Sequence, residues 1–336
     1  MAARAVSAVC SRPIAGDPLA AARAFEATAG LAATPAAERT QLIAVAAGQY
    51  YAARDYGRAA ELASRYFKAG GADPALRTIY VQALYLSNDF SHAGRELLAD
   101  VEGEERAGKT PAEMQLQMLA TCYQKTNDKA GYAHAMEKLV AFHPKHDYWA
   151  SVVYSVTTQP GFSDRLNLDA DRLKLATGTM RGAGDYMEAA QLALQAGFPA
   201  EAKKFVDAGY AAGLLGTGAD AARHKRLKDL TLKDLADDNK TLGQDDAKVA
   251  ADKDGAPLLN TGFNYVLHGR FDQGLAMMEQ GMKKGGLRHP DDAKLHLGYA
   301  YQLAGHKQKA THAFKSVQGA DGAAALARLW IIRVGQ

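Results

Sequence analysis

One pattern of turns and small residues recurs along this chain at intervals near 34 residues, and it limits the possible folds more than any other feature. Six segments share a turn with Gly, Asn or Asp and a helix-forming run that starts just after it. The position five places into each segment is Ala59, Ala93, Tyr132, Ala202, Gly274 or Ala310. Successive positions are 34, 39, 70, 72 and 36 residues apart. Each of the two long intervals is therefore expected to hold one further degenerate copy.

The stretch before each turn reads as a first helix that ends in an aromatic residue, such as Tyr50, Tyr123, Tyr265 or Tyr301. Small residues inside both helices of a unit would let the pair cross closely. Alanine is abundant and only five residues are isoleucine, a bias that favours helix over strand. Two helices in about 34 residues is the spacing of tetratricopeptide repeats. The predicted fold is all-α: a tetratricopeptide-like α-solenoid of antiparallel helix pairs in a right-handed superhelix, with degenerate repeats and a C-terminal capping helix.

The repeat phase divides the chain into seven segments. They are an irregular or truncated N-terminus (1–15), N-terminal repeats (16–146), a degenerate helical repeat (147–181), a further repeat (182–216), a polar, charged helical excursion (217–254), two C-terminal repeats (255–319) and a capping helix (320–336).

Three blocks of sequence resemble a known family: "PGFSDRLNLDADRLKLATGTM", "DYMEAAQLALQAGFPAEAKKFVDAGYAAGLLGTGADAARHKRLKDL" and "KGGLRHPDDAKLHLGYAYQLAGHKQKATHAFKSVQGADGAAALARLW". The family is that of exported tetratricopeptide-repeat proteins of Gram-negative proteobacteria, and the resemblance covers about 16–333. It implies a periplasmic protein with a signal peptide, a further N-terminal repeat and no catalytic site. The apolar patch from Ala5 to Cys10 is shorter than the ~7–15 residues of a signal-peptide core. We therefore expect the start to be internal or truncated, and a cytoplasmic location stays open.

The motifs of common catalytic and cofactor sites are missing from the sequence: HExxH, GxSxG, GxxxxGK[ST] and GxGxxG. The pair His143 and His146 has metal-like spacing, but Pro144 places it in a turn between repeats and no third ligand is near. Cys122 lies in an apolar helical stretch, where a buried thiol is expected. The sequence predicts no catalytic residues, no cofactor and no metal; an enzyme with an unrecognised site is the alternative.

The segment "NLDADRL" (167–173) starts like a calcium loop, with oxygen ligands at alternate positions. Such a loop needs Gly at its sixth position and Glu at its twelfth, where this chain has Arg172 and Gly178. On a helix, Asp169 and Asp171 would point about 160° apart, at 100° per residue. The segment is therefore predicted to be the second helix of the hidden repeat at 147–181, packed on two sides.

The run "RHKRLK" (223–228) is the densest basic stretch in a chain whose net charge is only +3. As a helix it would spread its cations around the circumference, and several aspartates follow it. A solvated helix face is predicted, and no nucleic-acid partner is expected; weak nucleic-acid binding through this run is the alternative. No stretch of the sequence is long and apolar enough to span a membrane.

First helices of such a solenoid line a concave groove that takes extended or helical peptides. The predicted groove has many amides and aromatics and few charges, which suits hydrogen bonding to a peptide backbone. Its residues are Gln82, Tyr85, Gln117, Thr121, Gln124, Gln191, Gln195, Phe263, Tyr299 and Gln302. The predicted function is a non-enzymatic scaffold that binds proteins or peptides in an envelope-associated assembly. The convex face and residues 219–254 remain alternative binding surfaces, and the partner and oligomeric state are open.

Overall fold

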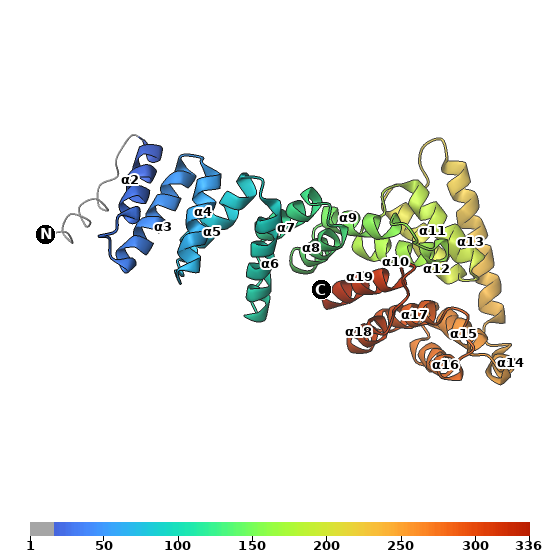
Figure 1. The fold of residues 1–336 in the computed structure, drawn as a ribbon. Helices are drawn as coiled ribbons and strands as arrows, with labels where there is room; N and C mark the ends of the chain where they lie inside the picture. The colour runs from blue at the N-terminus through green and yellow to red at the C-terminus, as the bar shows by residue number, and fades with distance from the viewer. Residues whose placement is uncertain (1–16) are drawn as a thin grey trace. The chain divides into compact units, whose positions relative to one another are not determined.

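The computed structural model describes residues 17–336, and all regular structure within them is helical (Figure 1). The chain divides into two compact units: unit 1 ends at Ala135 and unit 2 begins at Met136, so that the boundary falls inside α8 (Lys129–Phe142). Within each unit, successive helices pack against one another in antiparallel pairs. The all-α fold of paired helices predicted from the repeats is confirmed. The irregular N-terminus predicted for 1–15 and Cys10 lie outside the described residues.

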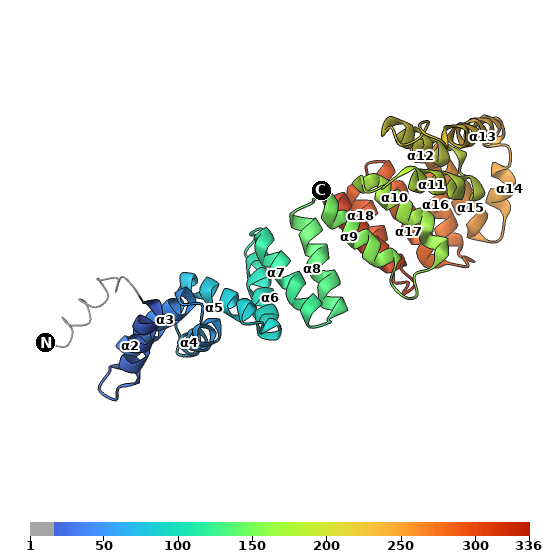
Figure 2. The ribbon, with the colours of Figure 1, turned by 90° about the horizontal axis from the view of Figure 1, so that it is seen from above.

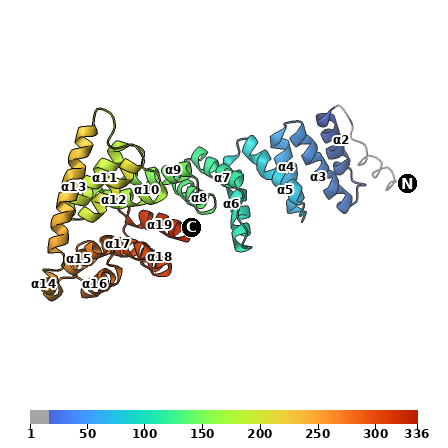
Figure 3. The same ribbon diagram turned by 180° about the vertical axis from the view of Figure 1, so that it is seen from behind.

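Unit 1 begins with a helix that has no earlier partner among the described residues and continues as helix pairs (Figure 3). Its helices before α8 are α2 (Pro18–Gly30), α3 (Ala36–Ala52), α4 (Tyr56–Lys68), α5 (Pro74–Leu86), α6 (Phe90–Arg106) and α7 (Glu113–Lys125).

The turns inside the pairs follow one design. Asn88 and Asn127 end α5 and α7 in the left-handed region, at φ 63° and 58°. The following aspartate then caps the second helix: the carboxylate of Asp89 accepts a hydrogen bond from the His92 N–H, at 3.3 Å. Gly269 and Gly305 take the left-handed position in unit 2, at φ 79° and 77°. These are the turn positions that the sequence predicts.

Unit 2 contains the two degenerate segments and the C-terminal repeats. Its elements after α8 are α9 (His146–Thr157), the 3-10 turn η1 (Asp164–Leu166), α10 (Asn167–Thr177), α11 (Ala183–Gln195), α12 (Pro199–Ala211), α13 (Ala221–Thr241), α14 (Asp246–Ala251), α15 (Gly255–Leu267), α16 (Phe271–Lys284), α17 (Pro290–Leu303), α18 (Lys307–Lys315) and α19 (Ala323–Gly335). Each is shorter or more polar than a membrane-crossing helix, as is every helix of residues 17–135.

The C-terminal helix α19 does more than cover the last repeat. It packs on α17 and α18 and also reaches α9 and α10, which begin 177 and 156 positions earlier in the sequence (Figures 1 and 2). Arg333 Nε donates a hydrogen bond to the backbone oxygen of Ala176, at 3.0 Å, and Arg328 Nε lies 3.0 Å from Glu137 Oε1. The helix therefore joins the first and last repeats of unit 2, a contact between distant segments that the repeat pattern does not encode.

Glycines set the distance between α15 and α16. A Cβ atom built on Gly274 would lie 2.5 Å from the carbonyl oxygen of Gly262, and one on Gly262 would lie 2.6 Å from that of Gly274. A Cβ on Gly255 would lie 1.9 Å from the carbonyl oxygen of Gly281. The two backbones therefore touch along their length, as the small residues at these positions of the repeat predict.

Candidate functional site

The predicted groove residues of unit 1 lie on two neighbouring first helices. Gln82 and Tyr85 are half-buried on α5, and Gln117 and Gln124 are exposed on α7 with Thr121 half-buried between them. Side chains of these two helices also line a cavity described below.

The predicted groove residues of unit 2 divide into two sets. Gln191 and Gln195 are exposed on α11, and Gln302 is half-buried on α17. Phe263 and Tyr299, however, are 0% and 8% exposed. These two aromatic residues belong to the core of unit 2 and have no surface on which a peptide could lie. The groove interpretation is corrected at these two positions.

Phe263 and Tyr299 are buried because they enclose a charge. The Arg172 guanidinium carbon lies 4.9 Å from the centre of the Phe263 ring and 5.5 Å from that of Tyr299. The His296 ring also stacks against Phe263, with ring centres 5.2 Å apart. Sequence reasoning missed Arg172, although its i,i+3 spacing from Asp169 on a helix is a signal for an ion pair.

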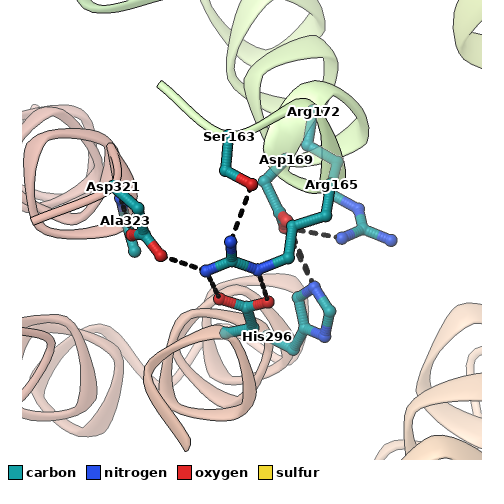
Figure 4. Close-up of polar contacts among 8 residues, drawn as sticks. Ser163, Arg165, Asp169, Arg172, His296, Asp321 and Ala323 are labelled. Atoms are coloured by element: carbon teal, nitrogen blue, oxygen red, sulfur yellow. Dashed lines mark hydrogen bonds and ion pairs between the residues drawn. The ribbon is translucent and has the colours of Figure 1, made fainter. Parts of the chain in front are cut away.

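Arg172 is paired on both of its sides. Its Nε and Nη2 atoms lie 2.8 and 2.6 Å from the two carboxylate oxygens of Glu201, and Nη1 lies 2.7 Å from Asp169 Oδ1. Asp169 also contacts His296 Nε2 at 3.1 Å (Figure 4). Burial lowers the pKa of Arg172, but Glu201 and Asp169 outweigh it and raise the pKa. Burial likewise opposes the charge on Asp169, yet His296 and Arg172 hold its pKa at about 2.

A second, more exposed ion cluster stands beside the first. Arg165 Nε lies 2.7 Å from Asp292 Oδ2, Nη1 donates to the Ser163 hydroxyl, and Nη2 pairs with Asp321 (Figure 4). Arg165 precedes α10, whereas Asp292 is on α17 and Asp321 precedes α19. Both clusters therefore join the degenerate repeat at 147–181 to the C-terminal repeats, and we interpret them as structural.

The aspartates of "NLDADRL" do not converge. Asp169 faces Arg172 and His296, whereas Asp171 Oδ1 accepts a hydrogen bond from Lys174 Nζ at 2.8 Å. The segment is helical, as predicted, although α10 begins only at Asn167 after the turn η1; both aspartates and Arg172 are buried. In residues 17–336, no group of three or more His, Cys, Asp or Glu side chains is placed to hold a metal ion.

The basic run 223–228 is partly absorbed into the fold. His224 and Leu227 are buried, and His224 Nδ1 accepts a hydrogen bond from the Gly216 N–H at 3.1 Å. Lys228 Nζ lies 4.4 Å from the centre of the Tyr210 ring, and Lys225 Nζ lies 2.6 Å from Asp229 Oδ2. One face of this run packs into the fold, and the positive charge on its other face is partly neutralised by a carboxylate of the same helix.

A cavity of about 670 Å³ lies in unit 1 between α5, α6 and α7. Its apolar wall includes Val81 and Leu97, and Met114 stands at its mouth with 66% of its surface exposed. Gln82 of the predicted groove also lines it, and its Oε1 accepts a hydrogen bond from the Tyr51 hydroxyl at 2.7 Å. The cavity joins apolar surface to amide groups that are already held in position.

Arg77 is the paired cation at this cavity, whereas Glu104 Oε2 is buried without a hydrogen-bond partner in residues 17–336 and exposed Lys109 also lines the cavity. Arg77 lies 2.6 Å from Glu96 and 2.9 Å from Asp100, and its guanidinium carbon is 5.8 Å from the centre of the Tyr80 ring. Burial lowers the pKa of Arg77, but hydrogen bonds and attraction from the two carboxylates raise it overall. We therefore expect apolar contact and hydrogen bonds to make the main contribution to binding in this cavity, because its arginine is already paired.

No protein-family model and no curated protein matches this chain. Two solved structures of tetratricopeptide-repeat proteins are similar to it at low levels. The TPR2AB domain of yeast Sti1, in a complex with pHSP90, is 11% identical over 89% of this chain and 100% of its own, with a TM-score of 0.28. The APC/C hetero-tetramer Cut9–Hcn1 is 13% identical over 91% of this chain, with a TM-score of 0.23; the chain spans 58% of its length. The assignment of tetratricopeptide-like repeats thus rests on the helix pairs, their spacing and their turns.

Proposed function

We propose that this protein is a scaffold that binds a segment of another protein in the cavity of unit 1. The observation that carries the proposal is the cavity itself: about 670 Å³ between α5, α6 and α7, with an apolar wall, an exposed methionine and fixed amide groups. Binding pockets combine a mostly apolar lining with a few placed polar groups. The surface beside it carries the amides of Gln117 and Gln124, which suit hydrogen bonds to a peptide backbone.

Two residues of α7 give the test. Met114 and Met118 line the cavity from one helix, so changing both to Glu places two charges on its apolar wall. Leu31 is the matched control: it is a similarly exposed apolar residue of unit 1, at 58%, and it is not among the residues that line the cavity. Partner proteins are first isolated by affinity capture on the wild-type chain. We expect them to bind the double variant at least about tenfold more weakly and to bind Leu31→Glu unchanged.

A second test concerns three residues of the predicted groove, Tyr85 on α5 and Gln117 and Gln124 on α7. Changing all three to Ala truncates side chains that are half-buried or exposed and leaves the buried core residues unchanged. Weaker binding with unchanged thermal unfolding would support the groove. Partners that are retained by both the triple variant and the cavity variant would move the site to the convex face or to 219–254.

We further propose that the protein works in an envelope-associated assembly in the periplasm. This placement rests on the resemblance to exported proteins of Gram-negative bacteria. The measurement is protease access: in intact spheroplasts an epitope-tagged periplasmic protein is digested, whereas a cytoplasmic control protein is protected. Protection of the tagged protein would exclude the periplasm and leave the binding proposal intact.

A further inference from the structure

A second cavity, of about 450 Å³, lies in unit 2 and is formed by α16, α17 and α18. Its apolar lining comes from Met282, Leu297 and Ala313, one residue from each helix. It shares no residue with the ion clusters at Arg172 and Arg165 or with the cavity of unit 1.

Hydrogen bonds hold the three helices around this cavity. The Tyr301 hydroxyl donates to Glu279 Oε1 at 2.5 Å, which joins α17 to α16, and Lys309 Nζ of α18 lies 3.3 Å from the same oxygen. Lys294 Nζ donates to the backbone oxygen of Ser316 at 3.1 Å, which joins α17 to the end of α18. The cavity is therefore formed before any ligand arrives, and binding there would not need the helices to move.

The ionisable side chains that line the cavity are basic or phenolic. Lys294, Lys309 and His312 line the cavity, together with Tyr301, and no Asp or Glu is among the lining residues. Lys294 is satisfied by Ser316 and by Asp291, at 2.8 Å.

Lys309 and His312 are the groups with spare donors. The Lys309 side chain is 62% exposed; its ammonium uses one of its three donors on Glu279 and lies 5.2 Å from the centre of the Tyr301 ring. His312 is exposed, and within residues 17–336 we find no hydrogen bond or ion pair for its ring. The two residues are three positions apart on α18, so their side chains stand side by side on one face.

We propose that this cavity binds a protein segment in which a carboxylate side chain stands next to a large apolar side chain. The apolar side chain enters between Met282, Leu297 and Ala313, and the carboxylate lies against Lys309 and His312. The apolar lining favours such a segment over a nucleic acid, whose phosphates would meet the same two side chains but would leave the apolar part of the cavity empty. This site lies in a different unit from the peptide cavity proposed above and takes a different chemistry.

The experiment observes the site directly. The full chain is labelled at its methionine methyl groups with carbon-13, and the Met282 signal is assigned from its loss in Met282→Leu. The probe is a short synthetic peptide in which two glutamates flank a leucine and a phenylalanine. One comparison peptide carries serine in place of both apolar residues, and an oligothymidylate of equal charge is the nucleic-acid comparison.

We expect only the first peptide to shift the Met282 signal in a saturable way. The double variant Lys309→Glu with His312→Glu should weaken that binding about tenfold, since it removes the Lys309 ammonium and the His312 ring donor and adds two repelling carboxylates. Lys307→Glu, an exposed change on the same helix that does not line the cavity, should leave it unchanged. The neutral pair Lys309→Gln and His312→Asn should give a smaller loss in the same direction.

Three results would overturn the proposal: no shift of Met282 with the apolar-acidic peptide, an equal shift with the oligothymidylate, or equal affinity of the double variant. The same spectrum keeps the two sites apart, because Met114 and Met118 line the cavity of unit 1. A peptide that shifts their signals and leaves Met282 still would support the proposed function and reject the second site.

Discussion

The guanidinium of Arg172 and the carboxylate of Glu201 form a bidentate pair, at 2.8 and 2.6 Å, and each side chain is only 1% exposed. Arg172 comes from α10 and Glu201 from α12, so the pair joins the degenerate repeat at 147–181 to the repeat at 182–216. A buried pair of this kind adds little net stability over apolar residues, but loss of one partner leaves the other charge without compensation. The pair therefore restricts which residues these two positions tolerate.

Replacing Arg172 with Met should destabilise unit 2 by about 3–5 kcal/mol, because Glu201 and Asp169 would stay buried without their cation. The measurement is urea unfolding followed by tryptophan fluorescence, since both tryptophans, Trp149 and Trp330, are buried in unit 2.

The matched control is Lys203→Met, which removes an i,i+4 surface pair with Asp207 and should cost no more than about 0.5 kcal/mol. Equal, small effects for the two substitutions would show that the buried charges relax to solvent.

Asp171→Asn should stabilise unit 2 at pH 7 and lose that gain as the pH falls. Burial raises the pKa of Asp171 from 3.8 to about 6, and Lys174 offsets only part of the rise. The folded state therefore binds a proton more readily than the unfolded chain, so wild-type stability falls as the pH rises from about 4 to 6. A pKa difference of about 2 corresponds to ~3 kcal/mol between the two ends of that range.

The difference in unfolding free energy between wild type and Asp171→Asn, measured at pH 4 and pH 7, checks this. Asp169→Asn is the comparison of opposite sign. Its pKa is lowered to about 2, so the charged form contributes stability that is present above about 4 and lost as the pH falls towards 2. A pH-independent effect of Asp171→Asn between about pH 4 and 7, or of Asp169→Asn between about pH 4 and 2, would contradict the assignment of burial and pairing.

Gly274→Ala should destabilise unit 2 by about 1–3 kcal/mol, because the new Cβ would lie 2.5 Å from the Gly262 carbonyl oxygen and 2.8 Å from the Val266 nitrogen. Both are backbone atoms, which cannot move aside as a side chain can. Gly184→Ala in α11 serves as the control, since nothing lies within 4 Å of its added Cβ. It should be neutral or gain up to about 1 kcal/mol. Thermal unfolding of both variants, read by the tryptophans, decides the matter.

Cys122 should react with a thiol reagent only when unit 1 opens. Its side chain is fully buried, and burial raises its pKa to about 11, so the thiolate is scarce at neutral pH. In a Cys10→Ser background, we expect slow labelling by a chromogenic disulfide in buffer and rapid labelling in urea. Rapid labelling in buffer would show that α7 opens easily.

How far the sequence predicts this fold is clearest at the turns and glycines. Asn88 and Asn127 predict left-handed turns, and Gly262 and Gly274 predict a close helix crossing. Both features depend on residues within a single repeat, so the local sequence is enough to predict them. The excursion 217–254 is only partly predicted. It holds a long helix, α13, followed by the short α14, and its Asp238 lies 2.6 Å from Nε2 of His268, the residue just after α15.

The candidate site is predicted less well than the fold. Gln82 does line the cavity of unit 1, but Phe263 and Tyr299, given the same role by phase alone, are enclosed around a buried arginine. Repeat phase gives the helix face on which a residue lies, and it does not say whether a distant helix covers that face.

By itself, the sequence determined the helix pairs, their period and their turns, because these depend on residues less than one repeat apart. Only the tertiary structure decided which helix faces stay open. In unit 2, α19 returns to α9 and α10, and Asp169 meets His296 across 127 positions. Such contacts form because buried charges and apolar faces need partners, and the partner is whichever distant segment the folded chain brings there.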